Sequence, residues 1–262
     1  MKFALVNGER QTARHGPPGI CPECEGPVIA KCGTKVVHHW AHKVSSNCNS
    51  RWENEGPWHQ AWKNHFPENW QEVVHFDDYG EKHVADVKTN RGWALEFQHS
   101  YLEPKERQSR DAFYCPKLIW VVDALRCETD FTQFDKMMKG ASRLDATGSF
   151  WAASPGSCRL VKEWSGSDAQ ILFDFGPKLG LWWMLGRLSN DQMLFARYTH
   201  TQFIEAHGGI EAQKDTDFDA LVKQLGTLVE EYERLIRSRS TVRFQPPLPA
   251  PRRPTRRRRR RW

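Results

Sequence analysis

Alternating apolar and polar residues predict two neighbouring strands in the middle of the chain, joined by the turn Asn90-Arg91-Gly92. A nearly continuous apolar run over 118–124 is typical of a strand that is covered on both faces. Gly56-Pro57 can open a helix, because proline is favoured in the first turn. Helices and strands therefore alternate, which predicts an α/β fold. The expected elements are strands at 73–76, 83–88, 93–98 and 118–124, and helices from Pro57 and over 103–114.

The second half of the chain has one strong periodic signal. Apolar residues recur every three or four positions over 218–236, which predicts a long amphipathic helix. Thr216 and Asp219 have the spacing of a capping box at its start. Upstream the pattern is weaker, and it favours a short helix over 131–138 and strand-like segments at 150–153, 159–164 and 171–185, the last split in two by Gly-Pro-Lys-Leu-Gly.

Composition places the chain among soluble folded proteins. It has 262 residues, of which 39% are hydrophobic and 27% charged, so it can bury a core. No apolar run approaches the roughly 18 residues of a membrane-spanning helix, and the first residues lack the apolar stretch of a signal peptide. We therefore expect a cytoplasmic protein with no membrane partner. Seven cysteines in such a chain favour reduced thiols and metal binding over disulfides.

The net charge of +6 comes from the C-terminal tail. Residues 252–262 contain eight arginines, which leaves 30 basic against 32 acidic residues in the rest of the chain. The preceding proline-rich stretch is typical of an extended linker. We expect the tail to bind nucleic-acid phosphates with little sequence preference. The alternative is a solvated charge run that aids solubility or contacts acidic proteins. The predicted nucleic-acid-binding residues are Arg256, Arg257, Arg258, Arg259, Arg260 and Arg261.

Cysteines and histidines near the N-terminus have the spacing of zinc ligands. Cys21 and Cys24 form a CxxC pair, and His39 and His42 follow after fourteen intervening residues. Two thiolates and two imidazoles can close a tetrahedral shell around Zn²⁺. Such a shell leaves no open position for water, so we predict a structural zinc that stabilises a segment too small to fold alone. The exact set of four stays open, because three further residues are nearby alternates: Cys32, His38 and Cys48.

The turn between the two central strands decides which side chains face each other. If Asn90-Arg91-Gly92 is a three-residue loop with Gly92 in the left-handed region, Asp86 pairs with Glu96. Their Cβ atoms then lie about 5 Å apart on one face, and alternation puts Gln98 on that face too. Two carboxylates there repel unless a cation separates them, so this register predicts a site for Mg²⁺ or Mn²⁺. The alternative is a solvated hairpin neutralised by Lys88 or Arg91.

The pattern Asp86, nine residues, then Glu96-x-Gln98 resembles the active-site hairpin of the PD-(D/E)XK nuclease superfamily, with glutamine in place of the usual lysine. Further residues keep the same order. Glu55, His59 and Lys63 recur every four positions before the hairpin, and a helix with Glu106, Arg110 and Tyr114 follows it. With the upstream cysteines and histidines, this order over residues 15–125 resembles the competence protein CoiA-like family.

The resemblance implies a restriction-endonuclease-like core, a mixed sheet flanked by helices, fused to a small zinc-binding module, with an α+β region after it. It also implies an association with DNA processing and recombination. Glu55 is followed by Gly56-Pro57, so it lies just outside the expected helix, and the arginine tail is not part of the family pattern. The implied regions are a zinc-ribbon-like module at 1–50, the nuclease-like core at 51–127, a C-terminal region at 128–241 and a disordered Pro/Arg-rich tail at 242–262.

We expect phosphodiester hydrolysis from these residues. Asp86 and Glu96 would hold one or two Mg²⁺ or Mn²⁺ ions that polarise the phosphate and activate water. Gln98 would orient the water or the phosphate. The three residues before the hairpin have supporting roles: Glu55 would complete the metal shell, and His59 and Lys63 would contact phosphate or assist proton transfer.

Two other functions stay open. One is a zinc-containing DNA-binding adaptor that holds its substrate without cutting, with a recombinase as a candidate partner. The other is a nuclease directed at RNA. For the favoured DNA nuclease, single-stranded or branched DNA is the preferred substrate, and the sequence leaves the oligomeric state open.

Overall fold

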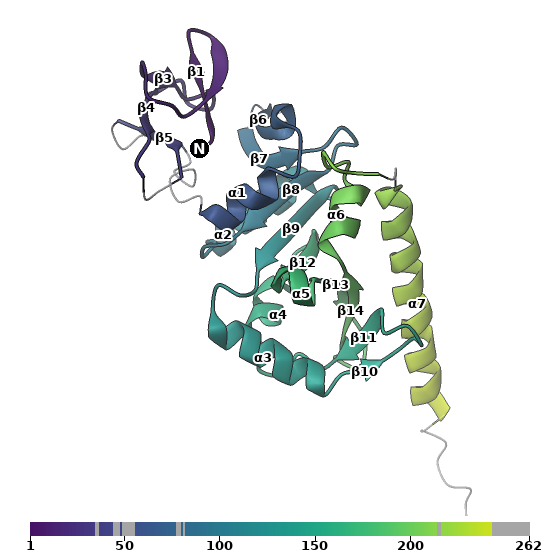
Figure 1. The fold of residues 1–262 in the computed structure, drawn as a ribbon. Helices are drawn as coiled ribbons and strands as arrows, with labels where there is room; N and C mark the ends of the chain where they lie inside the picture. The colour runs from purple at the N-terminus through teal and green to yellow at the C-terminus, as the bar shows by residue number, and fades with distance from the viewer. Residues whose placement is uncertain are drawn as a thin grey trace, which may run out of the picture.

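The computed structural model describes residues 1–34, 37–43, 48, 56–76, 80, 82–213 and 216–242, with the backbone alone for 239–242. Glu55 and the arginine tail from Arg256 to Arg261 lie outside these residues. The described strands form two separate sheets. Figure 1 shows the first sheet as a small N-terminal module beside α1 and β6, and the second as the centre of a larger body covered by helices.

The N-terminal module is a five-stranded antiparallel sheet around a small core that includes Met1, Val28 and Trp40. Gly19 is needed where two strands approach closely, since a Cβ at this position would lie 2.9 Å from the Cβ of Ala4. The strands follow the spatial order β2-β1-β3-β4-β5, with bounds β1 (Phe3–Val6), β2 (Glu9–Thr12), β3 (Gly19–Ile20), β4 (Pro27–Lys31) and β5 (His39–His42).

The larger sheet has nine strands and mixed direction. Its three middle strands β8, β9 and β12 are parallel, whereas the remaining strand pairs are antiparallel. Strands from before and after residue 127 join in this one sheet. The order is β10-β11-β14-β13-β12-β9-β8-β7-β6, with β6 (Gln71–Phe76), β7 (Lys82–Lys88), β8 (Ala94–Gln98), β9 (Leu118–Asp123), β10 (Ser142–Arg143), β11 (Phe150–Ala153), β12 (Gln170–Asp174), β13 (Leu181–Arg187) and β14 (Met193–Tyr198).

Helices cover both faces of the nine-stranded sheet (Figure 1). One apolar cluster buries side chains of α1 (Pro57–Lys63), α6 (His200–Ala206) and α7 (Phe218–Val242) against one face. A second cluster buries side chains of α2 (Pro104–Tyr114), α3 (Glu128–Lys139) and α4 (Arg159–Trp164) against the other. Two short helices, η2 (Glu68–Trp70) and α5 (Gly176–Leu179), connect elements. The predicted mixed α/β class is confirmed, with a large mixed sheet between helices.

Several predicted elements are confirmed within a few residues, and one is wrong. Residues 159–164 were expected to be strand-like but form α4. Leu160, Val161 and Trp164 are the buried residues of that segment, and their spacing puts them on one helical face. Strand β14 and helix α6 were not predicted, although α6 carries a local signal: the side chain of Thr199 accepts from the backbone N–H of Gln202, and Gln202 caps back.

Helix α7 is confirmed, but its cap differs from the prediction. The Oδ1 atom of Asp217, and not the side chain of Thr216, accepts from the N–H of Ala220 at 3.0 Å. Arg91 donates to the Thr216 carbonyl, and Trp93 Nε1 donates to Asp219 at 3.2 Å. These bonds join the start of α7 to the turn of the central hairpin, so the register of that hairpin is held by a distant part of the chain.

Candidate functional site

The zinc-ligand donors gather around one point in the N-terminal module. A donor atom from each of Cys21, Cys24, His42 and Cys48 lies within 4.8 Å of the others. The Sγ atoms of Cys21 and Cys48 are 3.8 Å apart, and Cys24 Sγ is 3.3 Å from His42 Nε2. A tetrahedral zinc with Zn–S near 2.3 Å needs ligand atoms separated by roughly 3.5 to 3.8 Å. The four residues therefore fit a Cys₃His zinc site.

The fourth ligand corrects the prediction, since Cys48 takes the place that the sequence gave to His39. Residues 39–42 form strand β5, in which positions three apart point to opposite faces. A strand therefore cannot direct both imidazoles of His39-Trp-Ala-His42 to one ion. His39 Nδ1 instead lies 2.8 Å from the Val37 carbonyl. Among the described residues, the cluster contains neither Cys32 nor His38.

Burial keeps two of these thiols protonated while no cation is present. It raises the pKa of Cys21, and burial together with a hydrogen bond from the Cys48 thiol to Glu23 raises the pKa of Cys48. Zinc binding must therefore displace protons from these thiols, so the affinity for zinc will decrease as the pH is lowered.

The central hairpin has the predicted register. Val87 pairs with Leu95 and Lys88 with Ala94. The N–H of Thr89 donates to the Trp93 carbonyl at 2.9 Å, and Gly92 has φ +81°. Extending this pairing by one residue sets Asp86 opposite Glu96 on the neighbouring strand.

Asp86 is buried between helix α1 and strand β8. Its Oδ2 atom accepts from the N–H of Phe97 at 2.8 Å and lies 2.8 Å from His59 Nε2. At this distance a protonated His59 forms an ion pair with Asp86. Burial alone would raise the pKa of Asp86, but the charges of His59 and Lys63 and the Phe97 N–H lower it below its usual value. Asp86 is therefore ionised at neutral pH.

Glu96 faces helix α2, where a buried arginine holds it. Arg110 Nη1 donates to Glu96 Oε1 at 2.5 Å and to the Val84 carbonyl at 3.1 Å. Burial alone would lower the pKa of Arg110, but Glu96 and, after it, Asp86 raise it. Arg110 therefore contacts Glu96 directly, and the charge of Asp86 adds to the rise in its pKa. Arg110 thus neutralises the acid that the hairpin buries.

Lys63 corrects another prediction, because it cannot reach a substrate phosphate. Its side chain is fully buried, and Nζ donates to Glu72 Oε1 at 2.6 Å. Glu72 was not predicted as a site residue. It follows η2 at the start of β6, between the β6–β7 pairs Gln71–Val87 and Val73–Ala85. Glu72, Asp86 and Glu96 thus form an acidic row on the neighbouring strands β6, β7 and β8, in which the first two contact α1 and Glu96 contacts α2.

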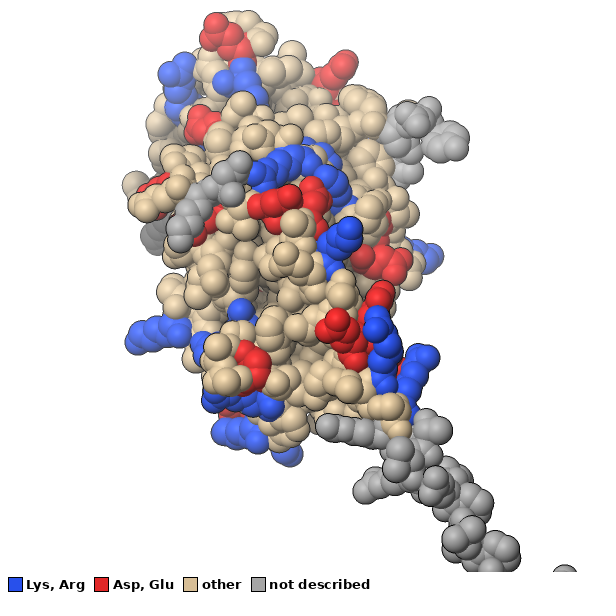
Figure 2. Space-filling model, turned by 90° about the vertical axis from the view of Figure 1, so that its right-hand side faces the viewer, with Lys and Arg blue, Asp and Glu red and all other residues tan. Residues whose placement is uncertain are grey.

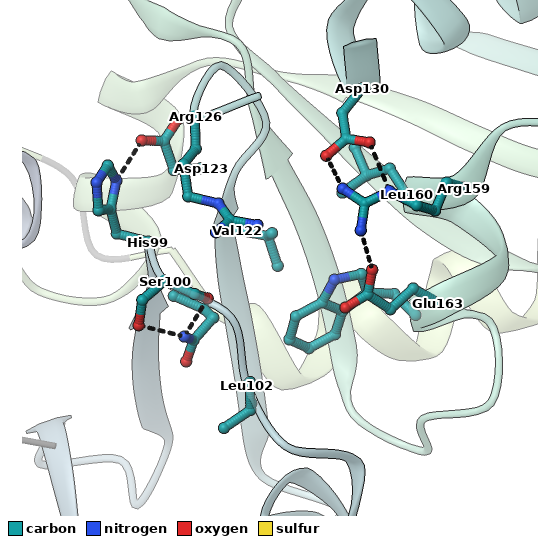
Figure 3. Close-up of a pocket in the computed structure, with 12 residues that line it drawn as sticks. His99, Ser100, Leu102, Val122, Asp123, Arg126, Asp130, Arg159, Leu160 and Glu163 are labelled. Atoms are coloured by element: carbon teal, nitrogen blue, oxygen red, sulfur yellow. Dashed lines mark hydrogen bonds and ion pairs between the residues drawn. The ribbon is translucent and has the colours of Figure 1, made fainter. Parts of the chain in front are cut away.

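Gln98 lines a pocket at the carboxyl ends of β8 and β9. Figure 3 shows the labelled residues of this pocket, among them His99, Asp123 and Arg159. Gln98 Nε2 donates to the Ser100 carbonyl at 2.7 Å. Across the pocket Arg159 pairs with Asp130 at 2.5 Å and with Glu163 at 3.2 Å, and His99 Nδ1 lies 2.7 Å from Asp123. Carboxyl ends of parallel strands commonly bind ligands in α/β folds. The pocket nevertheless pairs most of its charges internally.

Charges of both signs alternate on the face that Figure 2 shows, which carries α7. Two pairs on α7, Arg234–Glu230 at 3.8 Å and Arg237–Glu233 at 2.8 Å, illustrate this mixing. The described part of this face is therefore not a basic groove. Within the described residues, no helix is both long and apolar enough to cross a membrane.

Comparison with known proteins assigns the N-terminal module. The family model for the N-terminal domain of competence protein CoiA matches residues 8–51, which include all four residues of the zinc cluster. The match does not reach the acidic row of the larger sheet. No curated protein and no solved structure matches the chain. Residues 8–51 thus match the N-terminal domain of competence protein CoiA, which supports the resemblance to the competence-related, CoiA-like family.

Proposed function

We propose that the chain is a metal-dependent nuclease that hydrolyses phosphodiester bonds in DNA. One observation carries the proposal: extending the Val87–Leu95 and Lys88–Ala94 pairs by one residue sets Asp86 opposite Glu96, and the buried Asp86 carboxylate accepts from the N–H of Phe97, the residue after Glu96. Two buried acids that meet on adjacent strands are costly to a fold unless cations compensate them. Such a pair is a natural ligand set for a hard divalent cation.

Asp86 and Glu96 would hold Mg²⁺ or Mn²⁺. The donor set fits these ions, because both ligands are carboxylates and the pKa of Asp86 is lowered, so it presents a charged oxygen at neutral pH. When bound, the metal would polarise the phosphate and lower the pKa of a water molecule.

The residues around the acids would position substrate and protons. His59 is close enough to Asp86 to share a proton-transfer route, and its side chain keeps 16% of its surface exposed. Gln98 could orient a phosphate or water from the neighbouring pocket through its amide. Arg110 would act indirectly, by fixing the orientation of Glu96. Single-stranded or branched DNA is the favoured substrate, and the arginine tail would add affinity that falls with salt.

A non-catalytic adaptor is the second candidate, and a specific observation favours it. Each acid of the row already has a cationic neighbour from the protein itself: Lys63 at Glu72, His59 at Asp86 and Arg110 at Glu96. A row neutralised in this way is stable without metal. The same core could then hold DNA for a partner such as a recombinase.

The test is cleavage of end-labelled single-stranded, duplex and branched DNA, and of RNA, with Mg²⁺, Mn²⁺ or EDTA. We expect metal-dependent cleavage of DNA, and a loss of about a hundredfold or more in Asp86→Asn. Asp135→Asn is the matched control, since Asp135 forms a surface pair with Lys139 on α3.

Each outcome separates the candidates. Cleavage that survives both EDTA and Asp86→Asn would overturn the proposal. Cleavage of RNA alone would redirect it to an RNA nuclease. Binding of DNA without cleavage under every metal condition would favour the adaptor.

A further inference from the structure

Glu72 joins the N-terminal module to the candidate active site. Its carboxylate is buried and accepts the N–H groups of Lys2, at 2.9 and 3.0 Å to its two oxygens, and of Phe3, at 3.2 Å. The same carboxylate accepts from Lys63 Nζ at 2.6 Å. Strand β1 and helix α1 are therefore held by one side chain, although 60 residues of sequence separate Phe3 from Lys63.

The backbone at Glu72 is strained to make these contacts. Its φ is +47°, a left-handed conformation that costs a residue with a side chain roughly 1 to 2 kcal/mol. The β6–β7 pairing is interrupted there, since the paired positions on either side are Gln71 with Val87 and Val73 with Ala85. A strained acid persists only where its surroundings compensate it. Four hydrogen bonds from three donors supply that compensation.

Helix α1 carries this restraint to Asp86. Lys63 and His59 are one helical turn apart, so they lie on the same side of α1. Glu72 holds Lys63, and Asp86 faces His59 at 2.8 Å. Trp62, three residues after His59, stacks on Phe97 with ring centroids 5.4 Å apart, and the His59 ring lies edge-on to the same Phe97 at 6.2 Å. Packing on Phe97 thus holds one part of the helix, and Glu72 holds the Lys63 end of the face that presents His59.

We propose that Glu72 is a positioning residue, which sets His59 against Asp86 by anchoring Lys63 and ties this geometry to strand β1 of the zinc module. The proposal rests on the proposed nuclease function for its effect on rate. The zinc cluster is adjacent to this joint, because Cys21, Met1 and Glu72 line one small cavity together with Val74 and Val84 of the larger sheet. The module then acts as part of the catalytic framework and not only as a separate binding unit.

The experiment compares Glu72→Gln with Glu68→Gln in the full chain. Gln keeps the shape of Glu72 and removes the charge that holds Lys63. Glu68 is a matched control, since it is an exposed acid four residues earlier that also contacts Lys2, at 3.6 Å. For Glu72→Gln we expect kcat to fall on the order of ten- to a hundredfold, with KM changed by less than about twofold. Glu68→Gln should match the unaltered protein.

A readout independent of activity is the NMR signal of His59 in protein labelled with ¹⁵N-histidine and assigned with His59→Gln. We expect the His59 ring signals to shift in Glu72→Gln and to stay in place in Glu68→Gln. If Glu72→Gln does not fold, Glu72→Asp replaces it, because it keeps the charge but withdraws the carboxylate by one methylene. Unchanged His59 signals in a folded Glu72 variant would overturn the proposal. If the protein cleaves no nucleic acid, only the proposed nuclease function is wrong, and the His59 signals still test whether Glu72 positions His59.

Discussion

The two clusters of potential metal ligands in this protein are compensated in opposite ways. In the N-terminal module, the donor atoms of Cys21, Cys24, His42 and Cys48 face one another around a common centre. In the larger sheet, the three acids of the row each face a basic side chain of α1 or α2. The thiols of the first cluster need a bound cation to balance their charge once they lose their protons. The acids of the second cluster already face basic side chains of the protein.

This difference predicts a different role for the metal at each site. A metal that closes an otherwise incomplete shell contributes its binding energy to folding. A metal that enters a row already held by Lys63, His59 and Arg110 must compete with these side chains, so it would bind weakly and be available for chemistry. We therefore expect zinc to be structural and Mg²⁺ or Mn²⁺, if the nuclease proposal holds, to be exchangeable.

Removal of zinc should produce the largest effect. Structural zinc sites contribute about 10 to 16 kcal/mol in small zinc modules. A strong chelator should unfold strands β3–β5 of the module and leave the nine-stranded sheet folded. Hydrogen exchange measured by mass spectrometry checks this, with fast exchange expected in β3–β5 and continued protection in β9 and β12. If removal of zinc leaves the hydrogen exchange of β3–β5 unchanged, the zinc cluster does not stabilise the module, and the proposed difference between the two sites is wrong.

The sequence predicts a feature well where a short stretch determines it. The hairpin register is specified by the short Asn90-Arg91-Gly92 turn, and the pairs Val87–Leu95 and Lys88–Ala94 confirm it. The CxxC pair is equally local, because Cys21 and Cys24 lie on one tight turn. The long helix α7 has its own periodicity.

Features that depend on contacts between distant segments could not be predicted. The HxxH spacing favours His39 as a ligand, but the segment folds as strand β5, and Cys48 completes the cluster from further along the chain. The spacing of Lys63 favours a phosphate contact, but its partner Glu72 becomes visible only in the folded structure. Glu72 itself has no distinguishing neighbours in sequence, and its role arises from strand β1, about seventy residues away.

Loss of Arg110 should give the second largest effect. Arg110→Met leaves Glu96 buried without its partner, and such losses cost about 3 to 5 kcal/mol. Lys139→Met is the control, since the Lys139–Asp135 pair is on the surface and should contribute well under about 1 kcal/mol. Urea denaturation measures both. Added Mg²⁺ should stabilise Arg110→Met more than the unaltered protein, because the freed acids can then bind it; equal stabilisation would argue against a metal site at Asp86 and Glu96.

Acid should weaken the larger sheet through a buried histidine, by a smaller amount. Burial, with the nearby charge of Arg91, lowers the pKa of His207 to about 3. When a histidine stays neutral in the folded protein but is protonated in the unfolded chain, the free energy of unfolding decreases as the pH falls below about 6.5. Between pH 7 and pH 5 this amounts to roughly 2 kcal/mol.

His207→Phe should remove that dependence, since the ring packs among Phe203 and Phe218 with centroids 4.6 and 4.2 Å away. Exchange protection of β12 and β13, followed from pH 7 to pH 5, reports on this sheet apart from zinc release in the module. An equal loss of protection with and without His207 would assign the acid sensitivity to another group.

The smallest effect distinguishes the ligands within the zinc cluster. His39→Ala should leave zinc stoichiometry unchanged and cost little stability, because His39 contacts the Val37 carbonyl and lies outside the cluster. His42→Ala and Cys48→Ala should each weaken zinc binding by removing one of four ligands. Competition with a chromogenic chelator measures all three variants in the full chain. Because positions 39 and 42 are both histidines on strand β5, the pair of alanine variants is closely matched. Weaker binding in His39→Ala than in His42→Ala would mean that the strand does not direct these side chains to opposite faces.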